Sequence, residues 1–291
     1  GIIWADATKE RPIDWRESYS LNEKIPFGLY VFNQEHKAIF KPQTVEKFSE
    51  SPYEFLDKNY NTYDSIYDIE GTILLIQNKS AIDEFSENEL FYFASHRNAI
   101  FYSNSNFSQK FADSLGFEIE YSNDFADSLQ FKINRNQKAG NFYFNKGINT
   151  AYFSKIDTSK TEVLGTQINS KGEEFANFIK VKHLNGNFYL HLQPVAFTNY
   201  YLLNKNSQYT EDILGYIPSK SPIYWKVKQY DNEELSSSPM RYLLSQPALK
   251  WAWFLAWIAF VIFMIFNAKR RQRVIPIIEP LKNTTIDFTK T

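Results

Sequence analysis

The stretch that decides the fold spans residues 71–121, GTILLIQNKSAIDEFSENELFYFASHRNAIFYSNSNFSQKFADSLGFEIEY. Three short segments in it have the length and the apolar content of β-strands, at 72–76, 99–102 and 117–121. The first, TILLI, is continuously apolar, as expected of a strand that is buried on both faces. Segments between the strands are long enough for helices. This alternation is typical of a parallel α/β sheet.

Two helices are predicted between these strands. Ser86 and Glu89 form a capping-box pattern, and apolar residues follow them at helical spacing. A second helix is expected over 108–115, where Gly116 stands in the position that often ends a helix. Both helices connect consecutive strands, as crossovers in a parallel sheet must.

The loops after the first two strands are the candidate ligand-binding loops. In an open α/β sheet, ligands bind at the carboxyl ends of the strands. The predicted binding residues are Gln77, Asn78 and Lys79 in one loop and Ser103, Asn104 and Asn106 in the other.

The parallel unit has extensions on both sides. Upstream, a helix is predicted over 25–40, with Pro26 in its first turn. Downstream, about residues 128–193 alternate between apolar and polar positions, and Asn185 with Gly186 predicts a hairpin turn. We expect an antiparallel β-rich insertion there. Helical segments at 197–203 and 211–214 and a closing strand at 222–227 then return the chain to the α/β layer.

Residues 251–266, WAWFLAWIAFVIFMIF, are apolar on every helical face and predict a transmembrane helix over 248–268. Lys269, Arg270, Arg271 and Arg273 follow directly, so residues 269–291 should form a basic cytoplasmic tail. Trp251, Trp253 and Trp257 should lie at the membrane–water interface on the outward-facing side of the span. The α/β domain, residues 1–235, should then lie outside the cytoplasm, joined by a tether at 236–247. We interpret Gly1 as the start of a fragment from which an upstream anchor could have been removed.

Composition excludes several classes of function. The net charge is −1 and the only dense basic cluster flanks the membrane segment, so we expect no nucleic-acid partner. The absence of cysteine excludes disulfides, thiolate metal sites and cysteine nucleophiles. With 10 glycines, no Gly-x-Ser-x-Gly and no nucleotide-binding loop, the chain predicts no catalytic site and no cofactor.

Three weaker patterns remain as alternatives. His183 and His191 flank the hairpin, but independent strand histidines are the favoured interpretation, and we predict no metal site. Two carboxylate pairs, Glu118 with Glu120 and Asp124 with Asp127, could in principle serve acid–base catalysis. Aromatic residues between 53 and 67 could form a stacking surface, although core packing explains them more simply. They are Tyr53, Phe55, Tyr60, Tyr63 and Tyr67.

Two sets of motifs resemble one known family. The first is DWRESYS (14–20) followed by KIPFGLYV (24–31). The second comprises SPMRYLL (238–244), LKWAW (249–253), KRRQRVIP (269–276) and NTTIDF (283–288). Together they are similar to the domain of unknown function 4350 family, membrane proteins typical of Bacteroidetes. The likeness covers nearly the whole chain, although the β-rich section matches only in pattern.

The resemblance implies a flavodoxin-like sheet related to class I glutamine amidotransferases. It also implies a bacterial inner-membrane location with a periplasmic domain, and membrane or periplasmic partners that include a MoxR-type ATPase system. The amidotransferase nucleophile is a cysteine, which this chain lacks, so that activity is not carried over.

Three functions follow as hypotheses. The first is a noncatalytic envelope protein, held in the lipid bilayer, whose outer domain binds a protein or a ligand. The second is a membrane-anchored hydrolase of envelope glycan or peptide. The third is a purely structural assembly factor, which would need no concave pocket.

Overall fold

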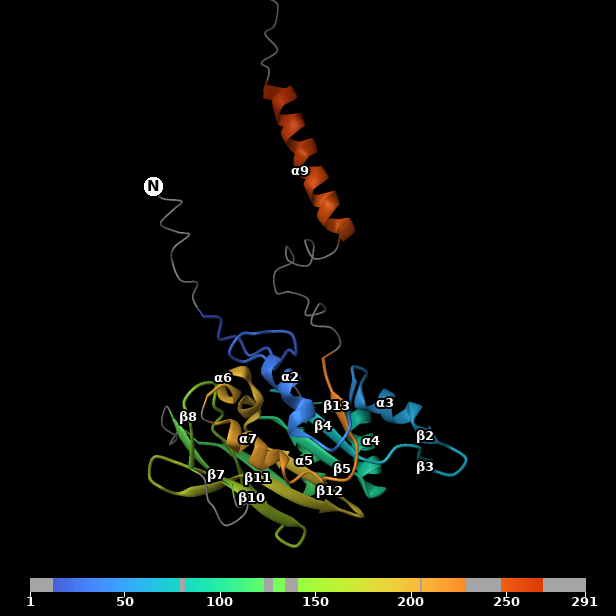
Figure 1. Cartoon of the computed structure of the whole chain (residues 1–291), viewed down its shortest axis with the longest axis vertical. Coiled ribbons are helices and arrows are strands. Elements are labelled where there is room, and N and C mark those ends of the chain that lie inside the picture. The colour runs from blue at the N-terminus through green and yellow to red at the C-terminus, as the bar shows by residue number, and fades with distance from the viewer. Residues whose placement is uncertain are drawn as a thin grey trace, which may run out of the picture. The chain divides into compact units, whose positions relative to one another are not determined.

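The computed structural model describes residues 13–78, 82–122, 128–133, 141–204, 206–228 and 247–268. Residue contacts divide the chain into two units, Gly1–Asp231 and Asn232–Thr291. Within the described residues, the first unit is a mixed α/β domain built on an eleven-stranded sheet (Figure 1). The second contains one long apolar helix.

Half of the sheet is parallel. Its strands, in spatial order, are β1 (Val45–Phe48), β13 (Ile223–Lys226), β4 (Thr72–Ile76), β5 (Ala99–Ser103) and β12 (Gly186–His191). Each pair of neighbours in this row is parallel. Every residue of β4 and β5 is buried, because helices cover both faces of the sheet at its centre. The predicted closing strand at 222–227 is confirmed, and it inserts between β1 and β4.

The other half is antiparallel and continues the same sheet. Its strands are β11 (Glu174–His183), β10 (Thr161–Ile168), β7 (Leu129–Ile133) and β8 (Asn141–Phe144), with β9 (Ala151–Ile156) pairing beside them. The predicted turn joins β11 to β12, with His183 opposite Gly186. At Gly186 a β-carbon would come within 2.1 Å of the Ala94 carbonyl oxygen, so only glycine fits this turn.

One part of the predicted parallel series is wrong. Residues 117–121 form β6 (Phe117–Tyr121), which pairs antiparallel with β9 and not with β5. The second neighbour of β5 is β12, which lies 83 residues after the end of β5 and has entered the parallel row from the β-rich section. In β6, Glu118 and Glu120 alternate with apolar residues, so this strand has one exposed face. Because β5 is buried on both faces, a neighbouring strand there should also be buried on both faces, and β6 does not meet this requirement.

Helices cover the two faces of the sheet. On one face lie α2 (Tyr30–Ile39), the 3₁₀ helix η1 (Pro194–Phe197), α6 (Asn199–Leu202) and α7 (Ser207–Leu214). On the other lie α3 (Pro52–Lys58), α4 (Glu84–Ser95) and α5 (Gln109–Leu115). Successive β4 side chains enter different cores, with Leu74 in the first and Ile73 and Leu75 in the second. The result is a three-layer domain (Figure 1).

Two helices begin elsewhere than predicted. The N-cap of α4 is Asp83, not Ser86, because the Asp83 carboxylate accepts from the Ser86 backbone N–H at 2.9 Å and from its hydroxyl at 2.7 Å. Helix α2 begins at Tyr30, not near Pro26. The carbonyls of Pro26 and Gly28 instead accept hydrogen bonds from the start of α6. By contrast, Gly116 ends α5 as predicted, with φ +74°, and Ser108, predicted as the first helical residue, is its N-cap.

The second unit contains α9 (Pro247–Ala268). Its 22 residues extend about 33 Å at 1.5 Å per residue, and the segment Ala248–Asn267 is long and apolar enough to cross a membrane. Trp251 and Trp257 are exposed along it, and the Trp253 and Trp257 rings lie 6.1 Å apart. The four predicted basic residues after α9 lie outside the described part of the chain.

Candidate functional site

A cleft of about 390 Å³ opens at the carboxyl end of the parallel strands. Asn78 reaches it from the loop after β4, Ser105 and Asn106 from the loop after β5, and Gln193 from the segment after β12. The cleft therefore lies where adjacent parallel strands of an open α/β sheet present their loops, the usual position for a ligand.

The N-terminal segment closes one side of this cleft. Asn78 donates from Nδ2 to Oε2 of Glu17 at 2.5 Å, and its Oδ1 accepts from the Ser105 hydroxyl, also at 2.5 Å. Lys228, just beyond β13, donates to the Ser18 carbonyl oxygen at 2.6 Å. These bonds join the segment around residue 17 to the ends of three strands, and so fix one wall of the cleft.

Tyr19 lines the cleft with a strained backbone. Its φ of +49° lies in the left-handed region, which is uncommon for any residue with a β-carbon. The side chain is buried, and burial, followed by the charge of Glu17 and the nearby Tyr201, raises the pKa of its hydroxyl well above the ordinary value. Strain of this kind costs about 1–3 kcal/mol and persists where surrounding contacts impose it, often at functional sites.

The opposite wall depends on a buried amide. The Gln193 side chain accepts from the Asn149 N–H at 3.1 Å and donates to the Asn149 carbonyl at 2.5 Å. This pairing imitates a strand ladder and holds the loop at 147–150 against the end of β12. Gln193 also donates to Gln167 at 3.4 Å. Thr150 and Tyr121 complete this side, and the Tyr121 side chain is 59% exposed.

The structure divides the predicted binding residues into two groups. Asn78 and Asn106 line the cleft. Gln77 and Asn104 instead donate to the Tyr102 hydroxyl, at 2.7 and 3.0 Å, and support the loops from behind. Lys79 lies outside the described residues. Glu17, Tyr19, Asn149 and Gln193 were not predicted, because nothing in the local sequence indicates that these distant segments meet.

Ser103 belongs to a buried polar chain beneath the cleft. Its hydroxyl lies 2.9 Å from Nδ1 of His191, whose Nε2 lies 3.2 Å from the Tyr209 hydroxyl. Asn177 donates to the same hydroxyl at 3.2 Å. Burial lowers the pKa of His191 to about 3, so the ring is neutral at physiological pH. Ser103 and His191 are fully buried and do not line the cleft, so this geometry gives a substrate no access to the hydroxyl.

The alternative catalytic groups do not converge in the part that the structure describes. Glu118 pairs with Lys155 at 2.8 Å, and Glu120 accepts from the Tyr152 hydroxyl at 2.9 Å, both on the exposed surface of β6. His183 lies at the turn end of the ladder between β11 and β12 and His191 at the other end. No three His, Asp or Glu side chains in the described ranges gather as metal ligands. Asp124 and Asp127 lie outside those ranges.

The aromatic segment does not form one continuous stacking surface. Phe55 and Tyr67 are buried in the core, whereas Tyr63 is 98% exposed. Tyr60 lies in β2 (Tyr60–Asn61), which pairs with β3 (Ile66–Tyr67), and its hydroxyl lies 2.9 Å from that of Tyr92. Packing explains most of these rings.

Comparisons with known proteins give no family. No family model matches the chain, and no curated protein matches its sequence. Among solved structures, it is similar to the exo-beta-1,4-mannosidase Op5Man5 from Opitutaceae bacterium strain TAV5, with TM-score 0.37, 12% identity, and coverage of 51% of this chain and 25% of that one. A beta-galactosidase from Rahnella sp. R3 gives TM-score 0.34, 11% identity, and coverage of 50% and 22%.

A third similar structure is a cytoplasmic protein from Salmonella typhimurium, with TM-score 0.29, 10% identity, and coverage of 60% of this chain and 71% of that one. The chain spans about a quarter of the length of the two glycosidases. Every TM-score is below 0.5, so none of these likenesses assigns a fold family or an activity.

Proposed function

We propose that this protein is a noncatalytic, membrane-anchored envelope protein whose α/β domain binds a neutral, hydroxyl-rich ligand in the carboxyl-edge cleft. Neutral saccharides are the ligand class that fits best. One observation carries the proposal: the described cleft lining is made mainly of amides and hydroxyls, with Glu17 as its one carboxylate and no cation.

Amides and hydroxyls each supply donors and acceptors, and so match a ligand whose hydroxyls do both. Asn78, Asn106 and Gln193 provide amides, and Thr150 a hydroxyl. Tyr121 adds an exposed ring on which an apolar sugar face could pack. A phosphate or a carboxylate ligand would be disfavoured, because Glu17 would repel it and no Lys or Arg lines the described wall.

The membrane arrangement is part of the proposal. The length and composition of α9 support an anchor, and the basic residues after it favour an outward-facing domain at the bacterial inner membrane. The family resemblance supports two further elements: kinship of the parallel half-sheet with flavodoxin-like and amidotransferase-like domains, and association with a MoxR-type ATPase system.

Calorimetric titration of the full chain in nanodiscs tests the binding function. The probes are chitotetraose and maltotetraose, with a sialylated oligosaccharide as the anionic comparison. We expect binding of a neutral probe, loss of binding in Asn106→Trp, which fills the cleft, and retention in Thr62→Trp, an exposed position remote from it. Equal binding by wild type and Asn106→Trp, or preference for the anionic probe, would refute the cleft assignment.

The 2.9 Å contact between Ser103 and His191 is the observation that favours a second candidate, a hydrolase of the same ligand. It would require the buried hydroxyl to become accessible. Mass spectrometry of the oligosaccharides after prolonged incubation separates the two functions, since binding alone releases no shortened products.

A further inference from the structure

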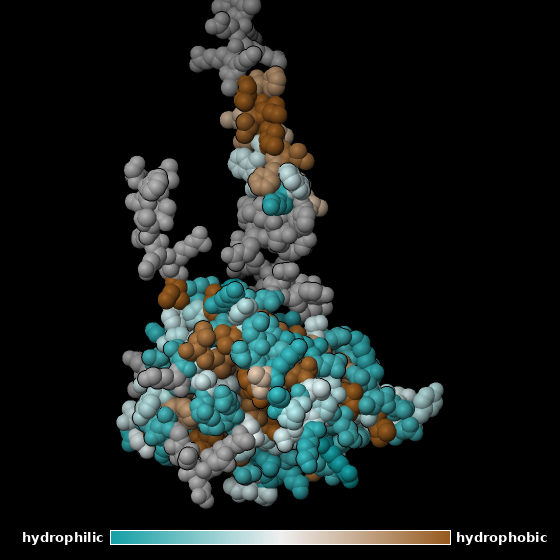
Figure 2. Space-filling view, viewed as in Figure 1, coloured by the Kyte–Doolittle hydropathy of each residue, from teal (hydrophilic) through white to brown (hydrophobic). Residues whose placement is uncertain are grey.

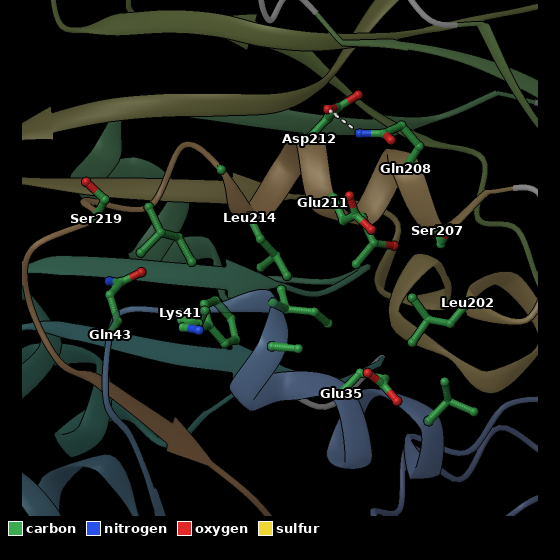
Figure 3. Close-up of a pocket in the computed structure, with 17 residues that line it drawn as sticks. Glu35, Lys41, Gln43, Leu202, Ser207, Gln208, Glu211, Asp212, Leu214 and Ser219 are labelled. Atoms are coloured by element: carbon green, nitrogen blue, oxygen red, sulfur yellow. Dashed lines mark hydrogen bonds between the residues drawn. The ribbon is translucent and has the colours of Figure 1, made fainter.

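A second hollow, of about 700 Å³, lies between α2 and α7 on the face of the domain seen in Figure 3. Its lining includes the apolar side chains of Val31, Ile39, Leu202 and Leu214, and we call these four residues its floor. Leu203, next to it, is 74% exposed. Figure 2 shows apolar patches on this face of the domain, set among hydrophilic surface. We call this hollow the helix groove.

Carboxylates stand on both rims of the helix groove. Glu35 projects from α2 and Glu211 from α7, on either side of the hollow (Figure 3). Both are exposed, and neither side chain has an ion-pair partner among the residues that the structure describes. Asp212 adds a third carboxylate, which accepts from Gln208 at 3.0 Å. Lys41 is the one cation of the described lining, so the groove carries net negative charge.

We infer that the helix groove binds a basic amphipathic helix of a partner protein. An apolar stripe on such a helix would cover the floor, and lysine or arginine side chains flanking the stripe would reach Glu35 and Glu211. This is a recurrent mode of peptide recognition, in which spaced apolar anchors fill a groove between helices. With 10 residues in α2 and 8 in α7, the walls accommodate about two to three turns of a bound helix.

The negative charge of the groove lining favours a basic helix over other binding partners. An anionic phospholipid surface or an acidic segment would bring negative charge against the rim carboxylates, which is unfavourable. A neutral apolar segment would cover the floor but would leave both carboxylates without partners. A basic helix satisfies the floor and the rims together.

The helix groove is independent of the carboxyl-edge cleft, because the two share no lining residue. Partner binding in the groove is therefore a separate function from ligand binding in the cleft. An experiment can disprove one of these two proposals without disproving the other.

Fluorescence anisotropy tests this inference on the full chain in zwitterionic nanodiscs. The probe is a labelled leucine–lysine peptide of about fourteen residues patterned as an amphipathic helix, and the comparisons are its leucine–glutamate counterpart and a scrambled leucine–lysine peptide. Empty nanodiscs give the lipid background. We expect the patterned basic peptide to bind the protein at least tenfold more tightly than either comparison peptide.

Variants then locate the binding. The double substitution Glu35→Gln with Glu211→Gln should weaken it roughly two- to thirtyfold, the range for loss of two exposed ion pairs. Asp57→Asn removes an exposed carboxylate from α3, on the opposite face, and should leave binding unchanged. Ala38→Trp, at an exposed groove position, should abolish binding without lowering the melting temperature. Equal binding of the scrambled peptide, or equal loss in Asp57→Asn, would overturn the inference.

Discussion

The side-chain amide of Asn78 donates to Oε2 of Glu17 at 2.5 Å and so joins the end of β4 to a segment 61 residues earlier. The same Asn78 accepts from Ser105 at 2.5 Å, after β5. One side chain therefore connects three segments of the cleft wall. Removal of the Asn78 side chain should therefore change the structure of the cleft more than that of the rest of the domain.

Asn78→Ala should weaken binding of a neutral oligosaccharide about tenfold. The substitution removes one ligand contact and the hydrogen bond that the Ser105 hydroxyl donates to Asn78, a loss of about 1–2 kcal/mol. Calorimetry of the full chain provides the measurement, and Asn61→Ala, in β2, is the matched control. An Asn78→Ala variant with wild-type affinity would show that this wall does not contact the ligand.

Ser103→Ala should destabilise the α/β domain by about 1–3 kcal/mol, because Nδ1 of the buried His191 would lose its partner. Ligand affinity should be unchanged, since Ser103 does not line the cleft. Denaturant unfolding gives the stability, with Ser114→Ala as a surface control expected to change it by less than about 0.5 kcal/mol. Unchanged stability together with loss of oligosaccharide cleavage would instead identify a nucleophile.

Stability should fall as the pH decreases below about 6.5. The pKa of His191 is about 3 in the folded domain, below its ordinary value, because burial disfavours the charged ring. Between pH 6.5, the ordinary pKa of histidine, and pH 3, the unfolded chain therefore binds more protons than the folded domain. The stability that the neutral His191 ring contributes is complete above pH 6.5 and is lost as the pH falls toward 3. Burial also lowers the pKa of His36 and His183, with the same sign.

His191→Gln should make this dependence shallower. Between about pH 4 and 6, the slope of unfolding free energy against pH should drop by about 1.4 kcal/mol per pH unit, the value for one proton. Denaturant titrations at a series of pH values provide the slopes. Identical slopes in the variant and the wild type would mean that His191 is protonated in the folded domain, contrary to its burial.

Local signals in the sequence predicted the centre of the fold. The apolar runs of β4 and β5, the Gly116 helix end and the Asn185–Gly186 turn are each determined by nearby residues, and each is present. Long-range pairing was not predictable in this way. The place of β12 beside β5 depends on the Asn98 and Ala94 carbonyls approaching Gly186, which no periodicity reveals.

The same limit applies to the site. Asn78 and Asn106 could be found because they follow recognisable strands, while Glu17, Asn149 and Gln193 reach the cleft through tertiary contacts. Ser103 also follows the β5 pattern, but sequence could not show that its side chain turns toward His191. Strand propensity predicts where β5 lies in the sequence. The direction of the Ser103 side chain at its end depends instead on the residues that pack around it.

Orientation of the chain in the membrane can be measured because the protein contains no cysteine. We expect Thr62→Cys, in the α/β domain, to react with a membrane-impermeant maleimide in intact cells carrying a permeable outer membrane. Thr289→Cys, in the basic tail, should react only after lysis. The reverse pattern of labelling would place the domain in the cytoplasm and would remove the envelope ligand from the proposal.

Hydrogen–deuterium exchange of the full chain, with and without saturating chitotetraose or maltotetraose, tests ligand binding at the cleft most directly. The account predicts ligand-dependent protection at residues 104–106 and 147–150, two loops that contribute residues to the cleft lining. Protection confined to residues 60–67, or no protection at either loop despite measured binding, would contradict it.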